Sequence, residues 1–112
     1  MNIVIAECEV RTLSLLSNIL ESRGHKVLKA SNVDEALAAI NSDMGAIVVD
    51  AEMEGNDDLK IARYARLTSN GARIIITTGL PTDKAMIVSK DLNAILLVKP
   101  FRLKQFIEAV GP

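Results

Sequence analysis

The sequence predicts an α/β fold: a doubly wound (βα)5 three-layer sandwich around a flavodoxin-like parallel sheet with strand order 2-1-3-4-5. Short apolar runs of strand type alternate with helical patterns five times along the chain. Three of these runs are almost wholly apolar, which is typical of strands that helices cover on both faces. Right-handed crossovers between parallel strands then place helices on both sides of one open sheet.

The five expected strands cover residues 3–6, 26–30, 46–49, 73–77 and 95–98. Helical spacing is clearest after the second strand, where Val33 begins an i, i+3, i+4, i+7 series and Asn32 with Glu35 forms a typical helix start. An apolar series from residue 10 predicts a longer first helix that Gly24 can end. The other expected helices cover residues 59–67, 85–92 and 103–110.

Composition limits the classes of function. The 112 residues, 49% hydrophobic and 24% charged, are expected to form one domain over residues 1–112. A formal net charge of -1, with one Tyr, two Phe and no Trp, argues against a basic or aromatic surface for direct nucleic-acid binding. The single Cys8 and single His25 exclude an internal disulfide and a zinc site. No apolar run approaches a membrane span, so we expect a cytoplasmic protein that does not enter a membrane.

Polar residues follow the expected strands at the edge where the carboxyl ends of parallel strands meet. In open α/β sheets the ligand site lies at this edge, between the first and third strands for the order expected here. Neighbouring carboxylates repel each other unless a cation joins them, and an oxygen-rich cluster suits Mg²⁺. The sequence therefore predicts a divalent ion site formed from these strand ends: Glu7, Cys8 and Glu9, then Asp50, then Thr77 and Thr78, then Lys99.

Each of these residues has a simpler interpretation when it is taken alone. Glu9 is best explained as a cap of the helix that begins at residue 10. Asp50 could cap a turn, and Lys99 could be a solvated charge. Their convergence at one edge, and no single member, indicates a site.

Together these residues resemble the response-regulator receiver domain, the phosphoacceptor module of two-component signalling, over essentially the whole chain. The pieces that match are an acidic cluster after the first strand, the segment AIVVD ending at Asp50, Thr-Gly after the fourth strand and VKPF after the fifth. The resemblance implies that Asp50 accepts a phosphoryl group from a histidine kinase or a histidine phosphotransfer protein. Such a module is a phosphoacceptor and not an enzyme in the ordinary sense, although it can assist its own phosphorylation and dephosphorylation.

The resemblance also assigns roles around Asp50. Lys99 would pair with the Asp50 carboxylate and then with the phosphoryl oxygens. Mg²⁺ would be held by the carboxylates of Glu7 and Asp50 and by the backbone carbonyl of Glu52. The Lys99–Pro100 peptide bond would be cis, which proline makes affordable.

The hydroxyl that would contact the phosphoryl group is that of Thr78 or Thr77. The spacing from Asp50 and the following Gly79 favour Thr78, whereas counting back from Lys99 favours Thr77. We take Thr78 as the candidate and allow for a one-residue deletion before Lys99.

The surface from the fourth strand to the fifth helix would carry the signal, if the resemblance holds. A downstream protein would bind there, and a second copy of the chain could pair through the same surface. Leu96 stands where the family often has an aromatic residue that moves on phosphorylation. A switch based on that aromatic residue is therefore absent or altered.

Cys8 aligns with the second acid of the family's metal-binding pair. A thiol is a poor ligand for the hard Mg²⁺ ion, so we expect weak binding. Glu9 could supply the missing carboxylate only if the chain has already turned, because strand geometry points it away from Cys8. We expect Cys8 to be a small buried residue and not a redox sensor, because Glu7 and Glu9 disfavour its thiolate.

The loop after Asp50 departs from the family as well. It reads MEGNDD over residues 53–58, where the family tends to read Met-Pro-Gly-x-Asp-Gly. Its acids Glu52, Glu54 and Asp57 would attract a cation but repel a phosphoryl donor. Two alternatives stay open: a degenerate receiver that binds partners without phosphorylation because of Cys8, and a flavodoxin-like domain for a nucleotide or flavin. The acidic, glycine-free first turn disfavours the second alternative.

Overall fold

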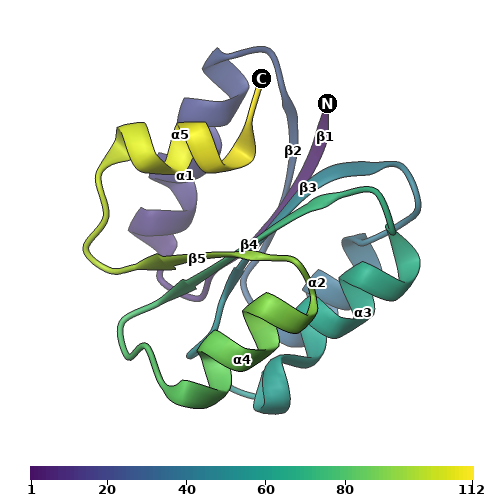
Figure 1. Ribbon diagram of the computed structural model, residues 1–112. Coiled ribbons are helices and arrows are strands. Elements are labelled where there is room, and N and C mark those ends of the chain that lie inside the picture. Colours follow the sequence, from purple (N-terminus) through teal and green to yellow (C-terminus); the bar gives the residue numbers. More distant parts are fainter.

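A computed structural model describes all 112 residues and confirms the predicted fold (Figure 1). All neighbouring strands pair in parallel, and their order in the sheet is β2-β1-β3-β4-β5, as the sequence predicts. The strands are β1 (Asn2–Ala6), β2 (Lys26–Ala30), β3 (Met44–Asp50), β4 (Arg73–Thr78) and β5 (Ile95–Val98). β3 and β4 each extend by one residue beyond the predicted end, which makes Asp50 and Thr78 the last residues of their strands.

Five α-helices cover the sheet, with α1 and α5 on one face and α2, α3 and α4 on the other (Figure 1). They are α1 (Val10–Ser22), α2 (Val33–Ala39), α3 (Lys60–Thr68), α4 (Asp83–Asp91) and α5 (Leu103–Val110), and a short 3-10 helix η1 (Asp57–Leu59) precedes α3. None of the helices has the length and apolar character that crossing a membrane requires.

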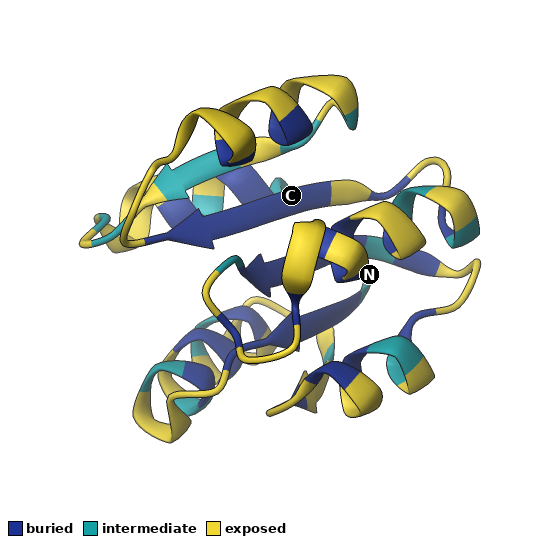
Figure 2. Ribbon diagram, turned by 90° about the horizontal axis from the view of Figure 1, so that it is seen from below, coloured by how far each residue is buried: buried dark blue, intermediate teal, exposed yellow.

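The three central strands are buried on both faces, which explains why their sequences are almost continuously apolar (Figure 2). Successive side chains of a strand point to opposite faces. In β1, Ile3 and Ile5 pack in the layer with α1 and α5, whereas Val4 packs in the layer with the other three helices. The two layers of apolar side chains hold the strand ends in fixed positions at one edge of the sheet.

The helix boundaries follow from local hydrogen bonds. The Asn32 side chain accepts a hydrogen bond from the Glu35 amide at 2.8 Å, which confirms the predicted start of α2. Gly24, at φ 90°, follows the end of α1 as predicted. Helix α4 begins two residues before the predicted position, because the side chain of Thr82 caps it by accepting a hydrogen bond from the Ala85 amide at 3.1 Å.

Candidate functional site

Asp50, Glu7 and Lys99 meet at the carboxyl edge of the sheet. Asp50 ends β3, Glu7 follows β1, and Lys99 follows β5. The Lys99 ammonium lies 3.4 Å from Glu7 Oε2 and 3.4 Å from Asp50 Oδ2, so one cation joins two carboxylates. Both acids are buried, with exposed fractions of 4% for Glu7 and 3% for Asp50. Each of these three residues is at least 43 positions from the other two in the sequence. The structure brings them together because parallel strands end at the same edge of the sheet.

The charges of this cluster perturb one another. Burial and the neighbouring Asp50 charge raise the pKa of Glu7, although the Lys99 ammonium and the Glu9 amide act in the opposite direction. Burial alone would lower the pKa of Lys99, but the carboxylates of Asp50 and Glu7 outweigh it and raise the pKa above its ordinary value. Lys99 is consequently held as an ammonium at neutral pH, where it offsets part of the negative charge.

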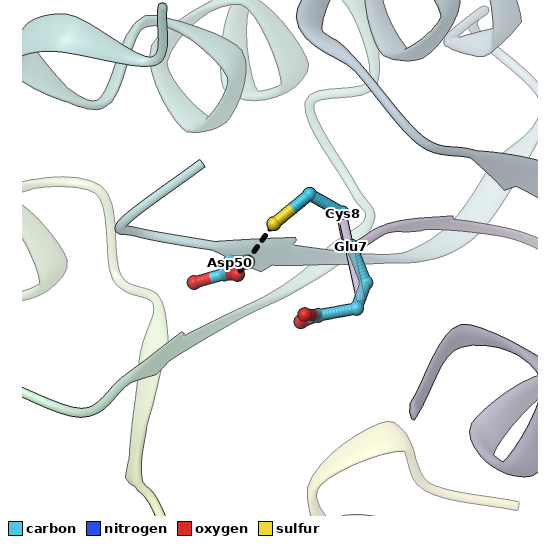
Figure 3. Close-up of side chains that lie close together, drawn as sticks. All are labelled: Glu7, Cys8 and Asp50. Carbon is cyan, nitrogen blue, oxygen red and sulfur yellow. Dashed lines mark hydrogen bonds between the residues drawn. The ribbon is translucent and has the colours of Figure 1, made fainter. Parts of the chain in front are cut away.

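Cys8 lies beside this cluster, but the expectation that it is buried is wrong. Its side chain is exposed, and its sulfur is 4.0 Å from Asp50 Oδ2 (Figure 3). β1 ends at Ala6, so the chain has left the sheet before Cys8 and the strand no longer dictates where the side chain points. Partial burial and the charges of Asp50 and Glu7 raise the pKa of the Cys8 thiol. The prediction that neighbouring acids disfavour the thiolate is thus confirmed, with Asp50 in place of Glu9 as the second acid.

Glu9 caps α1, as the sequence predicts. Its Oε1 accepts a hydrogen bond from the Arg11 amide at 3.2 Å, and its Oε2 accepts hydrogen bonds from both the amide and the hydroxyl of Thr12 at 2.6 Å. The hydrogen bonds from Thr12 lower the pKa of Glu9. The carboxylate that could have replaced the missing metal ligand is therefore engaged at the helix start, away from the Glu7, Cys8 and Asp50 donor group.

The two candidate hydroxyls have different partners. The Thr77 hydroxyl is buried and donates to the Val49 carbonyl at 3.4 Å, so it belongs to the sheet. The Thr78 hydroxyl lies 2.6 Å from Glu52 Oε2, and it also accepts a hydrogen bond from the Leu80 amide at 3.0 Å. Thr78 thus faces the loop that follows Asp50, which is the side expected of a hydroxyl that serves the site.

The side chains of Glu52 and Asn56 are features of the site that sequence reasoning missed. The sequence predicts a backbone carbonyl ligand and a general negative charge from Glu52, but no specific contact of its side chain, whose Oε1 accepts a hydrogen bond from the Gly79 amide at 2.5 Å. Asn56 is buried; its Nδ2 donates to the Asp50 carbonyl at 3.2 Å and its Oδ1 accepts from the Ile61 amide at 3.1 Å. Asn56 therefore ties the end of β3 to the first turn of α3.

The β3–α3 loop holds Asp50 from a second side. The Glu52 amide donates to Asp50 Oδ1 at 3.0 Å, which leaves Oδ2 as the oxygen that faces Lys99.

Asp58, at φ 58°, occupies the position where the family tends to have glycine, in a backbone region that glycine favours. Its carboxylate forms ion pairs with Lys84 of α4 at 3.0 Å and with Arg63 of α3 at 3.5 Å.

Three residues with possible metal ligands lie together at this site, and two of them, Glu7 and Asp50, suit Mg²⁺. One ligand atom from each of Glu7, Cys8 and Asp50 can be chosen so that all lie within 4.8 Å of one another (Figure 3). Mg²⁺ is commonly held by one or two carboxylates together with several waters, which Glu7 and Asp50 can provide. The Cys8 thiol does not suit this hard cation. Mg²⁺ would thus have two protein carboxylates here, and it would share them with the Lys99 ammonium.

A parallel five-stranded sheet with acids, a hydroxyl and a lysine at its carboxyl edge defines a receiver-type α/β domain. Over residues 3–111 the chain matches the family described as response regulator receiver domain. The chain therefore belongs to the response regulator receiver domain family of two-component signalling. This membership removes the nucleotide-binding or flavin-binding alternative. The Lys99–Pro100 bond is cis, as the resemblance implied.

Individual relatives agree with this assignment. The chain is 24% identical over 110 residues to sporulation initiation phosphotransferase F of Bacillus subtilis, covering 96% of this chain and 89% of that protein. A CheY-like receiver domain protein from Methanospirillum hungatei has a TM-score of 0.87 at 22% identity, covering 96% of this chain and 87% of that one. A response regulator from Burkholderia pseudomallei, solved with a phosphorylated aspartic acid, a calcium ion and citrate, has a TM-score of 0.82 at 28% identity, covering 98% of this chain and 66% of that one.

Proposed function

We propose that this chain accepts a phosphoryl group on Asp50 from a histidine kinase or a histidine phosphotransfer protein. The observation that carries the proposal is the Asp50 carboxylate at the end of β3 with the Lys99 ammonium 3.4 Å from its Oδ2. The phosphorylated aspartic acid of the Burkholderia relative and the phosphotransferase name of the Bacillus relative support it. The cytoplasmic location expected from the sequence stays a prediction.

The chemistry asks for a nucleophile and for positive charge around the transferred group. Asp50 Oδ1 is held by the Glu52 amide, so we assign the attack on phosphorus to Oδ2. The new oxygen–phosphorus bond gives an acyl phosphate, while the bond from phosphorus to the donor nitrogen breaks and the nitrogen leaves with the bonding electrons. Lys99 stabilises the negative charge of the phosphoryl oxygens, and the Thr78 hydroxyl donates a hydrogen bond to one of them.

Magnesium would supply further positive charge when it is bound. Glu7 and Asp50 would hold it, and the backbone carbonyl of Glu52 is the third ligand that the family resemblance implies. Because Cys8 adds no carboxylate, we expect weak binding of the ion. This same residue supports the second candidate function, a degenerate receiver that binds partners without phosphorylation.

The surface from β4 to α5 is proposed as the signalling surface. Half of the twelve large apolar side chains that are exposed belong to this part of the chain: Leu80, Met86, Ile87, Ile95, Val98 and Leu103. Such a surface suits a protein partner or a second copy of the chain. Leu96, in place of the family's aromatic residue, is half-buried in β5. A signal must therefore leave through the neighbouring residues and not through an aromatic rotation.

A labelling experiment tests the proposal and separates the two candidates. The protein is incubated with Mg²⁺ and phosphoramidate or a histidine kinase, and acid-stable, base-labile phosphate is measured beside an Asp50→Asn control. Labelling that the control lacks is expected. No labelling at any Mg²⁺ concentration would contradict phosphorylation. If Cys8→Asp then labels strongly and the natural chain does not, the degenerate receiver is the correct function.

A further inference from the structure

Glu52 places its carboxylate on two hydrogen-bond donors at the start of the β4–α4 loop. Its Oε2 lies 2.6 Å from the Thr78 hydroxyl, and its Oε1 lies 2.5 Å from the Gly79 amide. A Cβ added to Gly79 would stand 3.4 Å from the same carboxylate, so the close approach is to the backbone itself. One carboxylate thus bridges from the loop after Asp50 to the end of β4.

A hydroxyl and a backbone amide that converge on one anion are also the donors that a phosphoryl group would use. Hydrogen bonds to an anion are short and strong compared with those between neutral groups. A phosphoryl group on Asp50 would be attached two residues before Glu52, on the same loop, and its oxygens carry the same kind of negative charge. Because the Thr78 hydroxyl is the group proposed to contact the phosphoryl oxygens, the Glu52 carboxylate and the phosphoryl group would compete for this donor and for the adjacent Gly79 amide.

We propose that Glu52 is an internal ligand of the phosphoryl site, and that a phosphoryl group on Asp50 must displace its carboxylate from Thr78 and Gly79. This inference rests on the proposed phosphorylation of Asp50 and adds a restraint on it. Glu52 lowers the rate and extent of phosphorylation of Asp50. When Asp50 carries no phosphoryl group, the Glu52 carboxylate holds the start of the β4–α4 loop through its contacts with Thr78 and Gly79.

A general effect of acidic charge would not explain these contacts. Glu54 and Asp57 lie in the same loop and are exposed, but their side chains form no hydrogen bond or ion pair with the protein. Only Glu52 of the three reaches across to β4. Glu54 is consequently a matched control: its removal changes the net charge of the loop by the same amount without touching Thr78 or Gly79.

The Thr78 hydroxyl has a second acceptor beside the Glu52 carboxylate. It lies 2.9 Å from the Leu80 carbonyl, and its single proton can be donated to the carboxylate or to that carbonyl. Leu80 is exposed at the beginning of the signalling surface. The anion that binds the Thr78 hydroxyl therefore affects the contact between Thr78 and Leu80, at the start of the segment that leads into α4.

The test compares the full chain with Glu52→Ala and Glu54→Ala. The first measurement is amide hydrogen exchange at Gly79, which needs no phosphorylation. We expect exchange at Gly79 to become faster by a factor of about 10 in Glu52→Ala and to stay unchanged in Glu54→Ala, because only the first removes the acceptor. Unchanged exchange at Gly79 in Glu52→Ala would overturn the inference.

The second measurement is labelling by phosphoramidate with Mg²⁺, in which the phosphorus–nitrogen bond breaks as the bond to Asp50 forms. We expect the initial labelling rate of Glu52→Ala to exceed that of the natural chain by a factor of about 10, with no comparable rise in Glu54→Ala. Equal labelling of all three proteins would overturn the inference and leave the proposed function standing. An equal rise in both variants would replace it with simple charge repulsion. No label in any protein would overturn the proposed function itself.

Discussion

Replacing Cys8 by aspartate is expected to tighten Mg²⁺ binding, because it adds a third carboxylate beside Glu7 and Asp50. The Cys8 sulfur is 4.0 Å from Asp50 Oδ2 and marks where the new oxygens would lie. A carboxylate at position 8 would be attracted to a cation held by Glu7 and Asp50, and two opposite unit charges about 4 Å apart interact by about 4 kcal/mol at an effective dielectric constant of 20 and by about 1 kcal/mol in bulk water. Position 8 is exposed, so the gain lies nearer the lower figure.

A gain of about 1–2 kcal/mol corresponds to a Kd for Mg²⁺ that is lower by a factor of about 5–30. Isothermal titration calorimetry with MgCl₂ measures this directly. Without the ion, the same substitution places a third acid in the cluster, and the melting temperature should fall. With Mg²⁺ the melting temperature should rise with ion concentration, because the ion binds only the folded state.

The matched control is Cys8→Asn, which has the shape of aspartate without its charge. Equal Mg²⁺ affinity of Cys8→Asn and Cys8→Asp would refute the reasoning, because charge would then not be what the pocket lacks. A melting temperature of Cys8→Asp that does not respond to Mg²⁺ would have the same meaning. Cys8→Ser, which offers a neutral oxygen close to the size of the thiol, should fall between the natural chain and Cys8→Asp.

Three further predictions concern stability. Asn56→Ala should lower the free energy of unfolding by about 2–4 kcal/mol, measured by urea denaturation, because it leaves the Ile61 amide without an acceptor and removes a donor to the Asp50 carbonyl. Glu7→Gln should be more stable than the natural chain at pH 7, because the raised pKa of Glu7 means that the folded state disfavours the charged form of this side chain. This difference in stability should disappear as the pH falls towards 4.5, the ordinary pKa of a glutamate, because Glu7 is then protonated in the folded state. At Asp58, with φ 58°, Asp58→Ala should be less stable than Asp58→Gly in the same denaturation experiment, because both remove the same ion pairs and only glycine favours this backbone conformation.

The sequence was sufficient for the fold and for the residues at the strand ends. An apolar run shows where a buried strand stops, and the parallel topology places the following residues at one edge. That is why Asp50, Glu7 and Lys99 could be predicted to lie together although they are far apart in the chain. The helix cap by Glu9 was predictable for a different reason: a cap depends only on the spacing of neighbouring residues.

Side chains in the loops were beyond this kind of reasoning. Cys8 lies two residues beyond the end of β1, where the alternation of the strand no longer applies, and its exposure depends on how the backbone turns. The contacts of Glu52 depend on a side-chain conformation and on how closely its loop approaches Gly79. Asn56 joins two backbone groups that only the folded loop brings together. No periodic pattern in the sequence carries this information.

Two features of the site, at positions 8 and 52, bear on the phosphorylation proposed for Asp50. At position 8 the chain lacks a carboxylate where a cation would gain from it, because Cys8 contributes a neutral thiol 4.0 Å from Asp50. At position 52 it has a carboxylate on Thr78 and Gly79, where a phosphoryl group would need free donors. Negative charge is thus missing where it would hold Mg²⁺ and present where it would compete with phosphate. Both features are therefore expected to disfavour the proposed phosphorylation of Asp50.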